Sequence, residues 1–368
     1  MHGINVHGGR SMIYVYPDYY KKFKCIASEC PDTCCSQWQI VIDEDSLEKY
    51  KAYKGEYKKT LDKRIDWREG VFKHNKNGKC AFLCENKLCD MYINLGKESL
   101  CATCREYPRH TEEFENVREI SLSISCPEVA RILMSTNDKM TFYTKEDENA
   151  EIFEDFDYFL FSGLQDIREE IIKILQNRDI GIRERIDKVL QIGASAQRHY
   201  DDGNLTLWDE CDESDKVCVI NEYDLLHNQA LFLVEELEIL YDDWYDVLTD
   251  TQRYIFEDGQ DVYNENKKQF LEWWEKSDMT PLEIVLEQII VYFISIYLPG
   301  AVYDENIMGK VEACIGHGVE IYMLLLARWI KKKESFGMND LIELVYRYSR
   351  EIEHSDENLE KVEMLCWF

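Results

Sequence analysis

The sequence is poor in residues that break regular structure, with only six prolines and 17 glycines among 368 residues. This composition argues against a disordered or fibrous chain. The longest apolar run, IIVYFISIYLPGAV at residues 289–302, is too short to span a bilayer and contains Pro299. The first eleven residues, MHGINVHGGRS, lack the apolar core of a signal peptide. We therefore expect a cytoplasmic protein with no transmembrane segment.

Positive charge is scarce in the C-terminal two thirds of the chain. Residues 136–368 hold 22 Lys and Arg against 52 Asp and Glu, whereas residues 1–135 hold 21 against 20. Such an acidic field disfavours nucleic acid and anionic membranes as partners. It favours a cationic partner or substrate, or it serves solubility alone.

Cysteine, in contrast, is abundant and unevenly placed: ten of the 14 cysteines fall between Cys25 and Cys126. This predicts two domains, a loop-rich cysteine-cluster metal domain at 12–135 and an acidic all-helical domain at 136–368, in a mainly α chain. In the first domain we expect a short strand at 39–42, a helix at 43–65 with Asp43 as its cap, and a strand at 117–124. Apolar residues at helical spacing predict helices in the second domain at 148–177, 182–198, 221–256, 261–276, 280–298, 303–332, 338–353 and 356–366.

The clustered cysteines indicate a metal site. In a reducing compartment disulfides are rare, and thiolates are soft ligands that select zinc, iron–sulfur clusters or copper(I). Adjacent cysteines such as Cys34 and Cys35 rarely bond to each other. That pair fits two thiolates that reach one cluster, or two neighbouring metal centres.

The choice between zinc and iron depends on spacing. Structural zinc usually takes short C-x2-C knuckles, and only Cys101-x2-Cys104 has that spacing here. The other cysteines are irregularly spaced and too numerous for one four-cysteine zinc site. Irregular ligation from several loops is compatible with a 4Fe–4S cluster. We therefore favour iron–sulfur and keep zinc as the alternative.

Three segments carry a family resemblance: YYKKFKCIASECPDTCCSQWQIVID, GKCAFLCENKLCDMYINLGKESLCATCREYPRH and REISLSISCPEVARILM. Together they resemble the flagellin lysine-N-methylase family and, more loosely, cysteine-cluster proteins regarded as zinc- or iron-chelating. The resemblance covers about residues 14–135. It depends on a CC pair before a tryptophan and on the patterns C-x-F-L, L-C-x-x-Y and C-R-x-Y-P-R.

The resemblance implies an oxygen-sensitive 4Fe–4S cluster, S-adenosylmethionine as methyl donor and flagellin lysines as acceptors. It implies eight metal-site cysteines: Cys25, Cys30, Cys34, Cys35, Cys80, Cys89, Cys104 and Cys126. Cys84 and Cys101 lie in the same loops but outside the pattern. Eight thiols exceed the four that one cluster needs, so either two metal centres exist or half of these cysteines are structural.

The segment CREYPRH is the densest group of candidate catalytic residues. Arg105 and Arg109 are suited to clamping a carboxylate, and Tyr107 to acting as an acid or a base. The alternative is that the arginines and His110 donate hydrogen bonds around a cluster.

Two further motifs are weaker. No G-x-G-x-x-G follows a strand, so an ordinary Rossmann site for S-adenosylmethionine is not visible. The glycines of CIGHGVE, at residues 314–320, favour close helix packing over a cofactor loop. We expect Glu351-x-x-His354 to lie on the surface of a terminal helix, because no second E-x-x-H completes a di-metal ligand set.

The leading hypothesis is an iron–sulfur protein-lysine N-methyltransferase that uses S-adenosylmethionine and acts on flagellin or another lysine-bearing protein. One alternative is an iron–sulfur enzyme that modifies a different peptide or side chain. The other is a zinc-stabilised module that binds basic proteins without chemistry.

Overall fold

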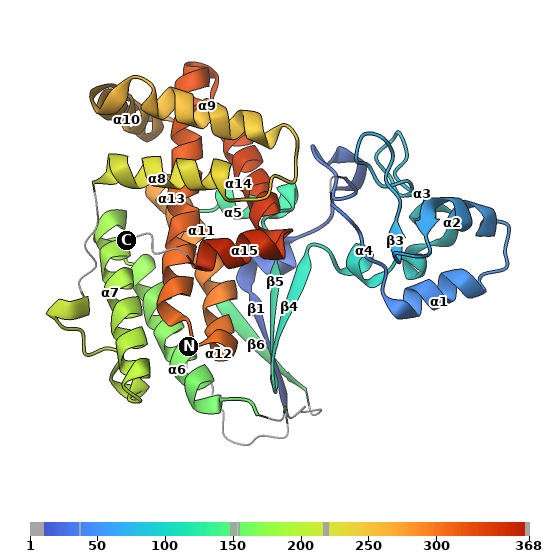
Figure 1. Ribbon diagram of the computed structural model, residues 1–368, viewed down its shortest axis with the longest axis horizontal. Helices are drawn as coiled ribbons and strands as arrows, with labels where there is room; N and C mark the ends of the chain where they lie inside the picture. The colour runs from blue at the N-terminus through green and yellow to red at the C-terminus, as the bar shows by residue number, and fades with distance from the viewer. Residues whose placement is uncertain (1–10, 37, 148–152, 154, 216–220, 365–368) are drawn as a thin grey trace.

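The computed structural model describes residues 11–36, 38–147, 153, 155–215 and 221–364. A large body contains most of the helices and a four-stranded sheet, and a small lobe projects from it (Figure 1). The prediction of a mainly helical chain is confirmed.

The body is built around one central helix, α13, which contacts helices from α7 to α15 on all sides. Helix α13 is apolar around most of its circumference, as expected for a helix that is enclosed by others. The body helices are α5 (Pro127–Met134), α6 (Tyr158–Leu175), α7 (Ile182–Asp201), α8 (Glu222–Glu235), α9 (Trp244–Phe256), α10 (Gly259–Lys276), α11 (Leu282–Tyr297), α12 (Ala301–Asp304), α13 (Ile307–Lys332), α14 (Met338–Glu353) and α15 (Asp356–Glu363). The short 3-10 turns are η1 (Asp18–Lys22), η2 (Ala27–Glu29), η3 (Lys97–Ser99), η4 (Leu205–Leu207), η5 (Glu213–Asp215), η6 (Leu298–Gly300) and η7 (Lys333–Ser335).

The glycines of CIGHGVE lie inside α13, where α11 packs closely. A Cβ atom on Gly318 would lie only 2.6 Å from Cγ1 of Ile290. His317, between the glycines, is buried with its ring 4.1 Å from that of Phe293 and its Nδ1 2.6 Å from the hydroxyl of Tyr348. The interpretation as close helix packing is confirmed for Gly318.

Two segments are long and apolar enough to cross a membrane by length and composition. They are Leu282–Asp304 and Ile307–Ser335, with mean hydropathies of 1.7 and 1.3. In the body, 78% of each apolar window is buried against other residues, which also characterises core helices. This is weak evidence for membrane insertion, and the absence of a transmembrane segment stays a prediction.

The sheet joins segments that are distant in sequence. Its strands are β1 (Met12–Pro17), β4 (Arg109–Phe114), β5 (Val117–Leu122) and β6 (Phe142–Asp147), in the order β4-β5-β1-β6. Strand β1 runs parallel to β5 and antiparallel to β6. The strand predicted at 117–124 is observed as β5. The domain boundary at 135 remains a prediction, and the sheet shows that strands on both sides of it pair directly.

The small lobe comprises residues 35–106 and has its own apolar core, which includes Leu61, Phe72 and Phe82. Its elements are α1 (Glu44–Ala52), α2 (Lys58–Arg64), β2 (Ile65–Asp66), β3 (Val71–Phe72), α3 (Asp90–Leu95) and α4 (Ala102–Glu106). Asp43 caps α1 as predicted, since its side chain accepts from the backbone N–H of Ser46 at 3.0 Å.

The single helix predicted at 43–65 is wrong, because the chain breaks between α1 and α2. The break occurs around Gly55, against which the Tyr53 ring packs. A Cβ at Gly55 would lie 2.3 Å from the Tyr53 hydroxyl. Val41 of the strand predicted at 39–42 makes a single bridge to Val71.

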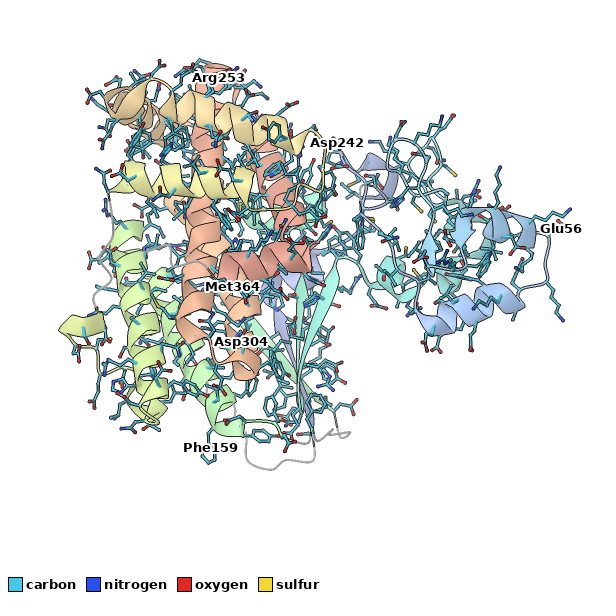
Figure 2. The ribbon with its side chains drawn as sticks, viewed as in Figure 1. Glu56, Phe159, Asp242, Arg253, Asp304 and Met364 are labelled. Atoms are coloured by element: carbon cyan, nitrogen blue, oxygen red, sulfur yellow. The ribbon has the colours of Figure 1, made fainter. Side chains whose placement is uncertain are left out.

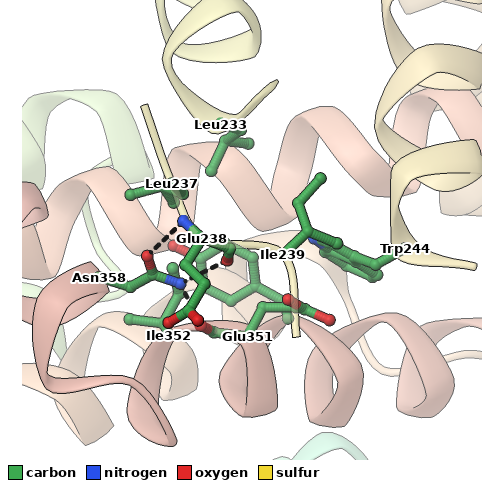
Figure 3. Close-up of a pocket in the computed structure, with 9 residues that line it drawn as sticks. Leu233, Leu237, Glu238, Ile239, Trp244, Glu351, Ile352 and Asn358 are labelled. Carbon is green, nitrogen blue, oxygen red and sulfur yellow. Dashed lines mark hydrogen bonds between the residues drawn. The ribbon is translucent and has the colours of Figure 1, made fainter. Parts of the chain in front are cut away.

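The single helix predicted at 221–256 is also wrong, because residues 236–243 form a loop between α8 and α9. Buried side chains from α14 and α15 take over the backbone hydrogen bonds that a continuous helix would make (Figure 3). Asn358 exchanges hydrogen bonds with the backbone of Glu238 at 2.8 and 2.9 Å. Glu351 accepts from the backbone N–H groups of Leu240 and Tyr241 at 2.8 and 3.1 Å.

This anchoring corrects the expectation for Glu351-x-x-His354. Glu351 is 3% exposed, so the motif does not lie on the surface. The cavity beneath the loop has a volume of about 10 Å³, enough for at most one water molecule. The role of Glu351 is structural: its carboxylate fixes the loop that carries Tyr241 towards the small lobe.

Candidate functional site

The described cysteines are all free thiols, and ten of them belong to the small lobe or to the chain segments on either side of it in the sequence. Cys218 and Cys366 lie outside the described residues. Local structure places several of the ten at helix starts: Cys89 precedes α3, Cys101 precedes α4 and Cys126 precedes α5. Cysteines at such positions gain from nearby backbone N–H groups, which favour the thiolate form.

One group of thiols lies at the junction between the lobe and the body, and we call its members the junction thiols: Cys25, Cys30, Cys34 and Cys126. Burial raises the pKa of Cys126 to about 11, and the neighbouring thiols of Cys30 and Cys25 add to the rise. Hydrogen bonding to Cys35 and burial raise the pKa of Cys34, and Cys126 and Cys25 contribute further. Each junction thiol therefore has at least one other within electrostatic reach.

A second group lies in the small-lobe core, and we call its members the lobe thiols: Cys35, Cys80, Cys89 and Cys104. Cys80 belongs to that core, and the other three pack against it. Burial raises the pKa of Cys80 to about 12, with Cys35 and Cys89 among the neighbours that add to it. Cys101 is fully buried beside Cys104 and hydrogen-bonds to it.

The adjacent pair Cys34 and Cys35 marks the border between the two groups. The carbonyl of Cys35 accepts from the backbone N–H of Cys80 at 2.8 Å, which ties Cys35 to the lobe. The carbonyl of Cys34 accepts from Nε1 of Trp38 at 2.7 Å, at the junction. A hydrogen bond from the Cys34 thiol lowers the pKa of Cys35 to about 7.

Within the described part of the chain, no three His, Cys, Asp or Glu side chains converge closely enough to hold a metal ion as they stand. The predicted metal site is therefore not shown and remains a prediction. The donor chemistry nevertheless fits a metal: each group offers four sulfur atoms, which are ligands for zinc and for iron–sulfur clusters.

Arg350 on α14 fixes the junction, although it is 1% exposed. Its Nη1 donates to Oδ2 of Asp32 at 2.5 Å, and its Nε donates to the carbonyl of Ser125 at 2.9 Å. Asp32 lies between Cys30 and Cys34, and Ser125 directly precedes Cys126. One guanidinium therefore holds the two chain segments of the junction thiols together. Its Nη2 is buried without a hydrogen-bond partner among the described residues.

Four rings pack around the same junction. The Trp38 ring lies 4.9 Å from that of His354 and 5.9 Å from that of Tyr107. The Tyr241 ring lies 5.9 Å from the Arg350 guanidinium, and its hydroxyl is 3.5 Å from the carbonyl of Ser36. The junction therefore combines aromatic faces with one buried cation.

A chain of hydrogen bonds runs from the junction into the body. Oγ of Ser125 lies 3.0 Å from the Tyr107 hydroxyl, 3.1 Å from Nε2 of His354 and 2.6 Å from Oγ of Ser123. Ser123 donates to Glu353 at 3.3 Å. The Glu353 carboxylate also accepts hydrogen bonds from Ser349 and from the hydroxyls of Tyr292 and Tyr297, the last two at 2.8 and 3.1 Å. We call the path Tyr107/His354–Ser125–Ser123–Glu353 the polar relay.

Burial sets the protonation of the relay. Burial, with a smaller contribution from the Arg350 charge, lowers the pKa of His354 to about 4, so the imidazole is neutral near pH 7. Burial also raises the pKa of Tyr107 well above its usual value, partly offset by Arg350. Nδ1 of His354 is buried and has no hydrogen-bond partner among the described residues. The relay thus has protonated donors and an open acceptor.

The structure separates the predicted catalytic residues. Tyr107 lies in the relay. Arg105 pairs with Glu106 at 3.0 Å and is partly exposed. Arg109 donates to the Tyr20 hydroxyl at 3.1 Å, on the sheet side, and is exposed. Only Tyr107 of the three joins the junction.

Sequence reasoning missed Arg350, His354, Glu353, Ser125 and Trp38 as site residues. The available signal was the spacing Tyr346, Arg350, His354 on α14, which places a cation and an imidazole four residues apart on a buried face. The sequence pattern predicts a surface position for Glu351-x-x-His354, and this prediction hides the role of His354.

Comparison with known proteins gives a consistent picture. Residues 168–367 match the family model described as FliB lysine N-methylase C-terminal domain. The chain is 31% identical over 137 residues to a lysine-N-methylase of Salmonella typhimurium, a match that covers 35% of this chain and 34% of that protein. It is 31% identical over 138 residues to the flagellar biosynthetic protein FliU of Salmonella muenchen, covering 35% of this chain and 82% of FliU.

The aligned part therefore spans about a third of the lysine-N-methylase relative. No solved structure matches the chain.

Arg350→Met should loosen the junction, because it leaves the Ser125 carbonyl and Asp32 without their partner. We expect a loss of about 3 kcal/mol in the free energy of unfolding and faster amide exchange in residues 24–36, measured by hydrogen–deuterium exchange. The matched control is Arg347→Met, one turn away, whose partners Asp243 and Glu343 have side chains that are 70% and 38% exposed; it should cost about 0–1 kcal/mol. Equal exchange in both variants would contradict the docking role of Arg350.

The lowered pKa of His354 predicts a pH-dependent stability. Between about pH 6.5 and pH 4, the His354 imidazole is protonated in the unfolded chain but neutral in the folded protein. Stability from this group is therefore lost as pH falls through that window, by about 3 kcal/mol in total. His354→Gln should remove the dependence in urea unfolding at pH 7, 5.5 and 4.5.

Glu351, whose pKa is raised by burial to about 7, titrates in the opposite sense, so the quantity to compare is wild type minus variant. The groups that face His354 are Arg350 and Tyr107. His227→Gln, at an exposed position, is the control. A constant difference between wild type and His354→Gln across this range would rule out a buried neutral imidazole.

Proposed function

Because this chain belongs to the FliB lysine N-methylase family, we propose that it transfers methyl groups from S-adenosylmethionine to lysine side chains of a protein, with flagellin as the first candidate substrate. The observation that carries the proposal is the polar relay, which ends beside the junction thiols. We further propose a cytoplasmic location and no role for nucleic acid, given the acidic helical part of the chain.

The relay suits the proton chemistry of a lysine acceptor. A lysine amine has a pKa near 10.4, so it arrives protonated and must lose a proton to become a nucleophile. His354 is neutral near pH 7 and its Nδ1 is the open acceptor. Because the pKa of His354 is only about 4, the imidazole does not retain a proton at this pH, and the group that can receive one is the Glu353 carboxylate, which Ser125 and Ser123 connect to the site. As the amine nitrogen bonds to the methyl carbon, the carbon–sulfur bond of the sulfonium breaks and leaves a neutral thioether.

The surroundings favour two cationic reactants. Trp38 and Tyr107 present aromatic faces, which attract ammonium and sulfonium groups. Exposed Asp242 lies on the 236–243 loop at the side of the body that faces the small lobe (Figure 2). Arg350 has a free Nη2 suited to a carboxylate, such as that of S-adenosylmethionine.

The junction thiols are the residues that would hold an iron–sulfur cluster. Bound there by all four thiols, a cluster would supply one-electron chemistry; bound by three of them, it would also leave an iron position for the amino and carboxylate groups of the methyl donor. The residues of this chain would orient the two reactants, exclude water and carry the proton away.

Methyl transfer tests the proposal directly. Anaerobically purified protein, with S-adenosylmethionine and unmodified flagellin, should yield N-methyl-lysine detectable by peptide mass spectrometry. Cys126→Ser should abolish the product, while Cys211→Ser, at an exposed cysteine outside both thiol groups, should retain it. Metal-loaded protein that methylates neither flagellin nor other lysine-bearing proteins would overturn the proposal.

Tyr107→Phe tests the relay. The ring and its packing on Trp38 remain, but the hydroxyl that reaches Ser125 is lost. We expect kcat to fall by about 10- to 100-fold with little change in KM, as for loss of a proton-transfer group. Tyr303→Phe, whose hydroxyl donates to the Glu113 carbonyl on an exposed site, serves as control. Full activity of Tyr107→Phe would remove this hydroxyl from the mechanism.

A further inference from the structure

We propose that the chain holds two separate metal centres, divided at the peptide between Cys34 and Cys35. The junction thiols hold an iron–sulfur cluster, and the lobe thiols hold a structural zinc ion. This inference rests on the proposed function only in taking the thiols as metal ligands, and methyl transfer is not needed to test it.

The first argument is that the two groups belong to different cores. Cys126 is part of the core of the body, together with residues of β5 and α5. Cys80 is part of the small-lobe core, against which Cys35, Cys89 and Cys104 pack. Zinc–sulfur bonds are about 2.3 Å long, so the four ligands of one zinc ion must share one location. Cys126 and Cys80, which belong to different cores, therefore cannot bind the same zinc ion, although the adjacent thiols of Cys34 and Cys35 are hydrogen-bonded to each other.

The second argument is that each group is held together by its own set of hydrogen bonds. Arg350 bridges Asp32 and the Ser125 carbonyl, which brings the segment of Cys30 and Cys34 to Cys126. On the lobe side, Cys35 accepts from the N–H of Cys80, and Ser36 bridges to Lys79. The CC pair lies between these ties, with one member on each side.

The third argument is the count. A four-cysteine zinc site and a fully cysteine-ligated cluster each need four thiols, and each group supplies four. Cys101 is a fifth thiol in the lobe and lies against Cys104. It forms with Cys104 the one C-x2-C spacing in the chain, which is typical of zinc knuckles. The thiols of each group are neighbours, and metal binding would draw them into one shell.

The two environments assign the metals. The lobe thiols lie among apolar side chains such as Phe82 and Met91, and this core is small. A domain of this size is commonly stabilised by structural zinc. The junction thiols lie beside the buried Arg350, the polar relay and unpaired polar atoms of Arg350 and His354. A positive charge and hydrogen-bond donors near sulfur stabilise a reduced cluster, and unpaired groups leave room for a ligand.

The adjacent cysteines allow a closely matched test. Cys34→Ser and Cys35→Ser change neighbouring residues in the same bend, and both positions are only partly buried. Iron, sulfide and zinc are counted per folded chain after anaerobic purification, and the reduced protein is examined by electron paramagnetic resonance. We expect Cys34→Ser to lose the iron, sulfide and cluster signal but keep about one zinc, and Cys35→Ser to do the reverse. Cys211→Ser should keep both metals.

A measurement on the wild-type protein guards against variants that fail to fold. A chelator that removes zinc should make the lobe thiols reactive to alkylation as a set, while the junction thiols stay protected, as read by mass spectrometry. Oxidative loss of iron should expose the junction thiols alone.

The outcomes separate this inference from the proposed function. One metal centre per chain, loss of the same metal from both variants, or exposure of all eight thiols together would overturn the division. Zinc at both positions would overturn the iron assignment. Two centres in a chain that transfers no methyl group would support this inference while the proposed function fails, and methyl transfer with one centre would do the reverse.

Discussion

The buried guanidinium of Arg350 is the interaction on which the candidate site depends. Removing this charge from water is costly unless its hydrogen bonds are satisfied. Two of its partners come from the loop before the small lobe and from the start of α5, so that Arg350 and Asp32 meet across 318 positions in the chain. The same side chain packs on the rings of Tyr241 and Tyr346. Because the hydrogen bonds of this one buried cation must be satisfied, Arg350 fixes how the lobe, the sheet and the C-terminal helices are placed relative to one another.

The two sides of that contact differ in polarity. The body brings serine and tyrosine hydroxyls to Glu353, and a second buried cation, Arg185, contacts both Glu283 and Glu287. The lobe interior is apolar apart from its sulfur atoms. Identical ligands placed in such unlike surroundings acquire different acidity, redox behaviour and access to solvent.

Much of this arrangement could be predicted from local sequence. Apolar periodicity predicted most body helices, Asp43 marked the start of α1, and alternation marked β5. The breaks at Gly55 and at residues 236–243 could not be predicted, because they depend on tertiary contacts: a tyrosine ring in one case and the side chains of Glu351 and Asn358 in the other. Strand β1 has only six residues, and its partners begin about a hundred residues later. For the site, the resemblance implied which thiols could bind metal, but only the fold shows which of them are neighbours. His354 and Arg350 looked like ordinary charged residues of a terminal helix, because nothing local indicates that α14 is buried there.

The insertion of the small lobe between β1 and β4 has a consequence for biosynthesis. The lobe thiols and their core are all encoded before residue 107, so the lobe can fold as soon as that part of the chain leaves the ribosome. Strand β1, by contrast, has no partner until β5 and β6 have been made, and Arg350 follows some 200 residues after β6. At about 5–20 residues per second, this delay of some 200 residues is on the order of 10 to 40 s. The order of synthesis thus makes the junction the last part of the molecule to assemble, after the lobe has already closed around its own sulfur atoms.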